Sequence, residues 1–283
     1  TPSNPTFAGC FSDASREGGA VTAPGYTHDA QCLVYRGPDA DYTGREVCLA
    51  SNEDVVTVFD VTDKANVRIV SQGAYPNDAY THQGALTSDG RYYLIDDELD
   101  EQNGSASTVR TIVMDFQDLD SPELAFIHDG ALSVIDHNQY IVGNRVYQSN
   151  YESGLRVLDV SQVGAGTLTE VAFFDTYPQG QSAQFNGQWA NYPFFPSGTL
   201  LGNDIQNGLF VLRPTALVAT AGEAQPSATS GEAGFALSGP SPNPAAGTAT
   251  LTLRVGAAQA VRAEAYGRLT SALTVRLEAL ADR

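Results

Sequence analysis

The sequence predicts an all-β protein: a β-propeller of four visible four-stranded blades, followed by a small C-terminal β-sandwich-like module. Two observations carry this prediction. A strand pattern recurs about every 50 residues, and runs rich in Val, Ile, Leu, Tyr and Phe are bounded by Gly, Pro, Asn and Asp. Repeated groups of four strands are typical of propeller blades, whereas a flat sandwich would not need the period.

Each repeat has the same order of elements. A leading segment with the first strand begins at Tyr26, Tyr80, Val134 and Gln184. A second strand, a polar turn and a third strand then begin at Gly44, Gly90, Gly143 and Gly198. An outer fourth strand follows in three repeats, in NVRIVSQGAY, PELAFIHDG and LTEVAFFDTY.

The two ends of the repeat array leave two alternatives open. The fourth repeat runs out after its third strand at Leu212, while the chain begins with a lone strand, PTFAGCFSD. That strand either completes the fourth blade of a closed ring or is the last strand of a further blade upstream. We expect a propeller over residues 1–214, a linker rich in Ala, Gly, Ser, Thr and Pro over 215–234, and a small β-module over 235–283.

The charge excludes some classes of partner. The chain has 33 Asp and Glu against 15 Lys and Arg, a formal net charge of -18, whereas nucleic-acid binding depends on basic side chains. We therefore expect no nucleic-acid partner. No stretch reaches the 18 apolar residues typical of a membrane helix, so we also expect no membrane span. The oligomeric state does not follow from the sequence.

Three histidines occupy equivalent places in the first three leading segments: His28, His82 and His137. In a propeller these segments share a face with the turns between second and third strands, so the imidazoles should surround the channel mouth. The polar residues expected beside them are Asp29, Gln83 and Asn138, with Asn186 near the same place in the fourth repeat. The histidines either bind a transition metal or hydrogen-bond the backbone of a neighbouring blade.

The second repeat carries an acidic insertion. Its repeat glycine and the Asp that ends its third strand are 25 residues apart, against 16 in the first and third repeats. The acidic residues of the segment DDELDEQNGSAST are Asp96, Asp97, Glu98, Asp100 and Glu101. Carboxylates at this density suit Ca²⁺, but on so acidic a protein the same run is also typical of a solvated surface. The matching turns of the other repeats are expected to be hairpin turns.

An aromatic cluster follows the fourth leading segment: Trp189, Tyr192, Phe194 and Phe195. Exposed rings of this kind form sugar platforms, and Trp189 is therefore a candidate binding residue. Packing between blades is the interpretation that we favour for the cluster.

The cysteines predict one disulfide. Cys32 lies in the first strand of the first repeat and Cys48 in the second, and a hairpin centred near Ala40 places them opposite each other. Cys10 would be a free thiol, or would take one of these partners if the N-terminal strand returns beside this blade. A disulfide implies an oxidising, extracytoplasmic compartment.

The segments YTHDAQCLVYRGPD, GREVCLASNED, YTHQGALTSDGRYYLIDDELDE, IDHNQY, NYESGLRVLDV and FNGQWANYPFFPSG together resemble the choice-of-anchor B family. These are bacterial extracellular proteins related to LVIVD-repeat propellers, and the resemblance covers about residues 5 to 214. The tail is similar to the C-terminal sorting domain of the type IX secretion system, whose PNP turn and following strand match Pro242 to Val255. The resemblance implies an extracellular or outer-membrane surface location in a bacterium, and it implies no particular activity.

Two functions compete. The first is a secreted or cell-surface binding or scaffold protein whose top face meets a protein or a glycan. The alternative is a metal-dependent enzyme with His28, His82 and His137 as ligands and Asp29 orienting one of them. The sequence contains no G-x-S-x-G, HExxH, Walker or G-x-G-x-x-G motif, which favours the binding protein. The cofactor does not follow from the sequence, and the candidates are Ca²⁺ and a transition metal.

Overall fold

The computed structural model describes Phe7, Phe11, residues 25–214 and three C-terminal strand segments, 235–241, 249–255 and 273–279. The predicted linker and Cys10 lie outside the described residues, as does most of the predicted N-terminal strand. Phe11 packs edge-on against Phe59, with ring centroids 5.2 Å apart. The pairing of the N-terminal strand and the domain boundaries therefore stay predictions.

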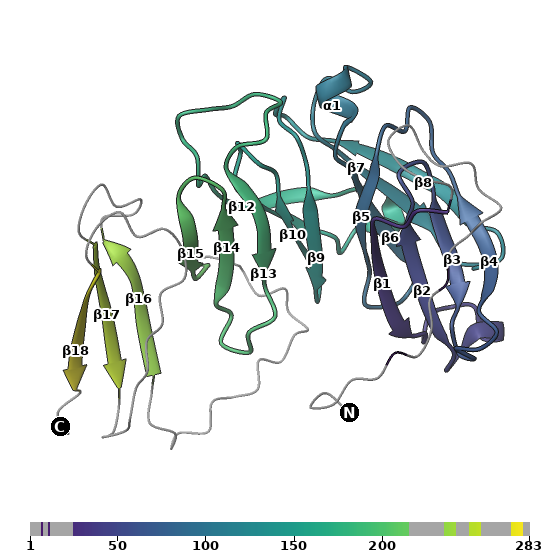
Figure 1. The fold of residues 1–283 in the computed structure, drawn as a ribbon, viewed down its shortest axis with the longest axis horizontal. Helices are drawn as coiled ribbons and strands as arrows, with labels where there is room; N and C mark the ends of the chain where they lie inside the picture. Colours follow the sequence, from purple (N-terminus) through teal and green to yellow (C-terminus); the bar gives the residue numbers. More distant parts are fainter. Residues whose placement is uncertain are drawn as a thin grey trace.

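The predicted β-propeller architecture is confirmed as four consecutive antiparallel meanders (Figure 1). Blade 1 comprises β1 (Asp29–Val34), β2 (Glu46–Ser51), β3 (Val56–Asp60) and β4 (Arg68–Gly73). Blade 2 comprises β5 (Thr81–Leu86), β6 (Tyr92–Asp97), β7 (Arg110–Asp115) and β8 (Glu123–Asp129). Blade 3 comprises β9 (Asn138–Val142), β10 (Arg145–Ser149), β11 (Leu155–Asp159) and β12 (Thr169–Phe174). Blade 4 comprises β13 (Gln188–Tyr192), β14 (Leu200–Asp204) and β15 (Gly208–Leu212).

Blade 4 has three strands among the described residues and ends at Leu212, where the sequence analysis placed the end of the fourth repeat. The first strands of successive blades, β1, β5, β9 and β13, contact one another in chain order. Two short 3₁₀ helices lie in connections, η1 (Ala40–Tyr42) and η2 (Val163–Ala165). No helix in the described part of the chain is long and apolar enough to cross a membrane.

The blades pack face to face through strands that are buried on both sides. Tyr93 and Ile95 of β6 face the core shared with blade 1, whereas Tyr92 and Leu94 face the core shared with blade 3. All four side chains are at most 8% exposed. The two-residue period of a strand thus assigns alternate side chains to two different cores.

Glycine recurs before the second strand of each blade because of the backbone conformation required there. Gly44, Gly90, Gly143 and Gly198 have φ values of 82°, 75°, 56° and 72°. This left-handed region disfavours side chains with a Cβ atom, so each hairpin between first and second strands needs glycine there.

An ion pair recurs beside this glycine. In three blades an arginine at the start of the second strand contacts the aspartate that ends the third strand, with N···O distances of 2.7 Å. The pairs are Arg45 with Asp60, Arg91 with Asp115, and Arg145 with Asp159. The spacing between glycine and aspartate seen in the sequence therefore reflects a repeated contact at one end of each blade.

Short bridges tie blades together at the opposite end. Glu53, in the turn after β2, forms a β-bridge with Thr81 of blade 2, and Tyr151 forms one with Gln188 of blade 4. Glu53 and Tyr151 have positive φ values of 74° and 34°. These turns are therefore more than the simple hairpin turns that the sequence predicted, because their backbone joins the next blade.

The insertion in blade 2 forms a one-turn helix, α1 (Asp100–Asn103), ending at Gly104 with a φ of 84°. Asp96 and Asp97 are not in the loop but in strand β6, where they are 2% and 0% exposed. The alternative of a solvated acidic surface is therefore wrong for this segment.

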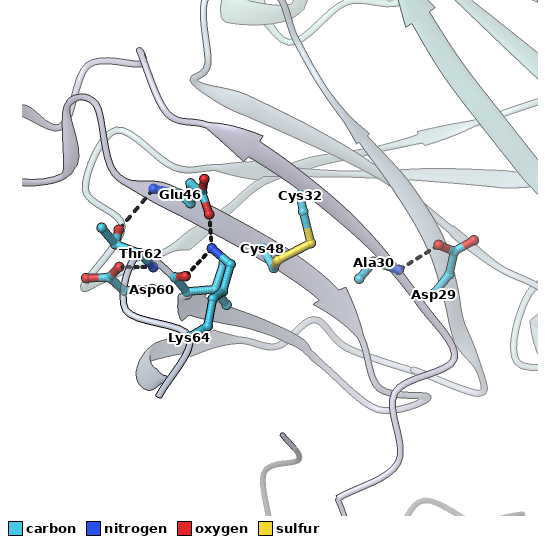
Figure 2. The surroundings of a disulfide bond; sticks show 9 residues. Asp29, Ala30, Cys32, Glu46, Cys48, Asp60, Thr62 and Lys64 are labelled. Carbon is cyan, nitrogen blue, oxygen red and sulfur yellow. Dashed lines mark hydrogen bonds and ion pairs between the residues drawn. A yellow bond between two sulfur atoms is a disulfide. The ribbon is translucent and has the colours of Figure 1, made fainter. Parts of the chain in front are cut away.

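The predicted disulfide between Cys32 and Cys48 is confirmed (Figure 2). The two residues are direct partners in the β1–β2 register, with Cα atoms 4.0 Å apart. The C-terminal segments form a separate three-stranded sheet of β16 (Phe235–Ser241), β17 (Ala249–Val255) and β18 (Leu273–Ala279). β16 and β17 are antiparallel, and β17 and β18 are parallel.

Candidate functional site

The structure brings together the three histidines that the repeat pattern singled out. The ring centroids of His28 and His82 are 4.3 Å apart, and those of His82 and His137 are 4.4 Å apart. Trp189 continues the series in blade 4, with its ring 5.7 Å from that of His137. The four rings thus occupy equivalent places in successive blades.

Hydrogen bonds between blades fix the tautomers of two histidines. His82 Nδ1 donates to the carbonyl oxygen of His137 at 2.7 Å, and His137 Nδ1 donates to that of Trp189. A carbonyl oxygen only accepts, so Nδ1 carries the proton and Nε2 carries the lone pair. The predicted alternative of bonding to a neighbouring blade's backbone thus holds for both residues, and it leaves Nε2 available as a metal ligand.

Glu98 lies opposite the two Nε2 atoms. Its Oε2 is 3.7 Å from His82 Nε2, and its Oε1 is 3.6 Å from His137 Nε2. Two ligands of a tetrahedral metal with bonds of about 2.1 Å are separated by about 3.4 Å. His82, Glu98 and His137, the histidine site hereafter, therefore have nearly the spacing that a transition metal requires.

Two further side chains donate hydrogen bonds to residues of the histidine site. Tyr151 donates its hydroxyl to Glu98 Oε1 at 2.6 Å, which orients the carboxylate. The indole Nε1 of Trp189 donates to His137 Nε2 at 2.7 Å, although half of the Trp189 side chain is exposed. The lone pair of His137 Nε2 is thus engaged by the indole of Trp189, which any metal ion at this atom would have to displace.

Burial keeps the imidazoles neutral. Burial and, to a smaller extent, the neighbouring His82 together lower the pKa of His137 to about 3. Burial also lowers the pKa of His82, although Glu98 acts in the opposite direction. Partial burial and the neighbouring His82 likewise lower the pKa of His28. All three rings are neutral near pH 7, the form that binds metals.

His28 differs from the other two histidines. Its side chain is exposed, and its Nδ1 contacts the hydroxyls of Tyr26 and Tyr80 at 3.1 and 3.0 Å rather than a backbone carbonyl. Asp29, expected to orient a histidine, instead accepts the amide of Ala30 at 2.6 Å (Figure 2). The first position of the ring series therefore has an exposed imidazole beside the histidine site.

Asp96 and Asp97 do not join Glu98 in the histidine site. Asp96 Oδ1 accepts the amide of Gln83 at 3.0 Å and lies 3.3 Å from His82 Nδ1. Asp97 accepts the amides of Ala79 and Tyr80 at 2.9 and 2.6 Å. Both carboxylates hold the backbone of the leading segment that carries His82.

The remaining candidate binding residues are mostly structural. Gln83 is buried, and its side-chain oxygen accepts the amide of Gln139 at 2.8 Å. Asn138 donates to the Trp189 carbonyl at 3.2 Å. Asn186 donates to Glu152 at 2.8 Å, and Trp189, not Asn186, takes the fourth place in the ring series.

The aromatic cluster is not the interblade core that we favoured from the sequence. Trp189, Tyr192, Phe194 and Phe195 are 50%, 47%, 45% and 42% exposed. Tyr192 stacks edge-on with both phenylalanines, at centroid distances of 5.3 and 5.0 Å. Phe194 also lines a cavity of about 160 Å³ against the first strands of three blades. The four rings thus present accessible apolar faces, and Trp189 among them contacts the histidine site.

No family model and no curated protein match this chain. Solved structures resemble it at low identity. A protein from Lactobacillus plantarum is 16% identical, over 60% of this chain and 51% of that chain, with a TM-score of 0.48. A periplasmic gluconolactonase from Pseudomonas aeruginosa is 16% identical over 66% and 49%, with a TM-score of 0.47. The β-propeller domain of Cps50 (Swd1) from Myceliophteria thermophila is 13% identical over 66% and 52%, with a TM-score of 0.43. This chain spans about half the length of each of these structures.

Proposed function

We propose that the protein is a bacterial extracytoplasmic β-propeller binding protein that holds a transition metal at His82, Glu98 and His137. One observation carries the proposal: hydrogen bonds to the next blade turn the Nε2 lone pairs of both histidines toward one carboxylate. Two imidazoles and a carboxylate suit Zn²⁺, Fe²⁺, Ni²⁺ or Cu²⁺ better than Ca²⁺ or Mg²⁺.

The partner is a protein or a glycan that meets the metal at this face. The half-exposed rings of Trp189 and Tyr192 support contact with an apolar or sugar surface. The Cys32–Cys48 disulfide supports secretion into an oxidising compartment. Attachment at the outer-membrane surface, membership of the choice-of-anchor B family and a type IX sorting tail rest on the sequence resemblance.

A metal titration tests the proposal. Untagged protein is treated with chelator and titrated with Zn²⁺ while the emission of Trp189, the only tryptophan of the chain, is recorded. We expect one ion per chain and a change in emission as the indole leaves His137. His82→Ala should abolish both effects, whereas His128→Ala, in outer strand β8, should preserve them. Absence of stoichiometric Zn²⁺ from the wild-type protein overturns the proposal.

His28 supports a second candidate function, a metal-dependent enzyme. This exposed, neutral imidazole lies beside His82 and has the chemistry of a general base. Zn²⁺-loaded protein is assayed with aryl esters and phosphate esters, alongside His28→Ala. Turnover that His28→Ala removes without loss of metal favours the enzyme, and equal rates in both proteins favour the binding protein.

A further inference from the structure

Three buried carboxylates converge beside the histidine site. Asp100 and Glu101 come from α1, and Asp136 immediately precedes His137. One oxygen of each lies within 4.8 Å of the others. The exposures of the three residues are 1%, 8% and 2%. These residues, the carboxylate cluster hereafter, are separate from the ligand set of His82, Glu98 and His137.

Four oxygens of the carboxylate cluster have no hydrogen-bond partner: both Oε atoms of Glu101, Oδ1 of Asp100 and Oδ1 of Asp136. Buried polar atoms in folded proteins are nearly always paired, and buried carboxylates require a compensating charge or donor. The converging oxygens therefore require either protons on the carboxylates or a bound cation.

The nearby positive charge does not balance the cluster. Arg110, the first residue of β7, donates to Asp100 Oδ2 at 2.5 Å, and its guanidinium is 4.0 Å from Asp97. One guanidinium thus pairs with Asp100 and also lies near Asp97, so its single charge is shared between two carboxylates. Either protons or a divalent cation must offset the remaining negative charge.

We propose that the carboxylate cluster is a second cation site, specific for a hard divalent ion of the Ca²⁺ class. Its donors are all oxygens, whereas the histidine site offers nitrogens. Two ligands on opposite sides of a Ca²⁺ ion with bonds of about 2.4 Å are about 4.8 Å apart, and the oxygens of the cluster are no farther from one another than this. Asp136 lies outside the acidic insertion and is a further ligand in this proposal.

In this proposal, a cation in the carboxylate cluster also positions residues of the histidine site. Glu98 lies two residues before Asp100, and His137 directly follows Asp136. A cation that joins α1 to Asp136 therefore fixes two of the three members of the histidine site. This coupling rests on the proposed function, whereas Ca²⁺ binding itself does not.

Equilibrium dialysis with Ca²⁺ tests the site on the full chain, after chelator treatment and without transition metal. We expect one Ca²⁺ per chain and a higher Tm in millimolar CaCl₂ than in NaCl of equal ionic strength. Because no transition metal is present, a negative result overturns the second site and leaves the histidine site untouched. Equal melting curves in Ca²⁺ and in the matched salt also overturn it.

Two substitutions locate the ion. Glu101→Gln preserves size and should remove the Ca²⁺-dependent rise in Tm, as should Asp136→Asn. Asp118→Asn is the matched control, because Asp118 belongs to a more exposed acidic group with Asp39 and Asp120 and should leave Ca²⁺ binding intact. In chelator, Glu101→Gln should be at least as stable as wild type, since it removes an unbalanced charge. Full Ca²⁺ binding by folded Glu101→Gln contradicts the proposed ligand set.

Discussion

His82 Nδ1 donates to the carbonyl oxygen of His137, 2.7 Å away in the next blade. The bond joins the same position of two successive repeats, and His137 repeats it toward Trp189. The histidine site consequently exists only where blades 2, 3 and 4 are packed in register. Binding of a metal should therefore report on interblade packing as well as on local side-chain geometry.

Trp189→Phe should strengthen metal binding. The substitution removes the Nε1 donor that engages His137 Nε2 and retains an aromatic ring. One net hydrogen bond is worth about 1 kcal/mol, so the affinity for Zn²⁺ should rise about fivefold. Competition with a chromophoric chelator measures this without tryptophan emission. Unchanged or weaker binding would show that the indole does not compete with the metal.

Reduction of the Cys32–Cys48 disulfide should destabilise blade 1. The cysteines are 16 residues apart, and closing a loop of this length is worth about 3 kcal/mol. Urea unfolding with and without reductant measures the difference. The double variant Cys32→Ser with Cys48→Ser is the control, and its midpoint should not depend on reductant. A wild-type midpoint that reductant leaves unchanged contradicts this expectation.

Asp60 should make stability depend on pH in the acid range. Burial acts to raise its pKa, but hydrogen bonds from Thr62, Arg68 and Arg45 outweigh it and hold the pKa below the usual value of 3.8. A lowered pKa stabilises the fold above the unfolded-state value, and this contribution is lost as pH falls through the folded-state value.

Asp60→Asn should therefore cost about 1–3 kcal/mol at pH 7 and less below pH 4. Urea unfolding at several pH values measures both effects. Glu123→Gln, an exposed carboxylate of β8, is the control and should change stability little at any pH. A constant difference between Asp60→Asn and wild type from pH 7 to pH 3 would contradict the assignment.

Leu94→Ala should weaken the packing of blade 2 on blade 3. Leu94 is fully buried in their shared core with Val146 and Leu158. Such truncations leave a cavity and cost about 2–5 kcal/mol. Leu124→Ala, at a 36% exposed position of β8, should cost far less. Similar unfolding midpoints for the two variants would argue against a core at this interface.

The sequence repeat predicted the fold because the residues that recur in it have local structural roles. The glycines have positive φ, and the aspartate that ends the third strand pairs with arginine in three blades. The places of His28, His82 and His137 followed from the same period. Cys32 and Cys48 were paired correctly because a hairpin has a defined register.

The burial and the spatial partners of these side chains could not be predicted from the sequence. The run from Asp96 to Glu101 looks solvated, yet α1 folds inward and Arg110 arrives from the next strand. Asp136 was missed because its partners lie more than 30 residues earlier in the chain. The aromatic cluster was assigned to an interblade core because large rings are typical of cores, whereas Trp189, also a candidate binding residue, continues the histidine series in blade 4.

The recurring arginine–aspartate pair has a consequence for the design of variants. In blade 2 the chain from Arg91 to Asp115 is nine residues longer than the equivalent stretch of blade 1 and ten longer than that of blade 3, yet the N···O distance is 2.7 Å in all three blades. The end of a blade that carries the arginine–aspartate pair thus keeps its geometry whatever the length of the turn between the second and third strands at the opposite end. Randomised peptides inserted at the exposed part of that longer turn, between Gly104 and Ser105, should therefore yield libraries that keep the scaffold while displaying new surfaces.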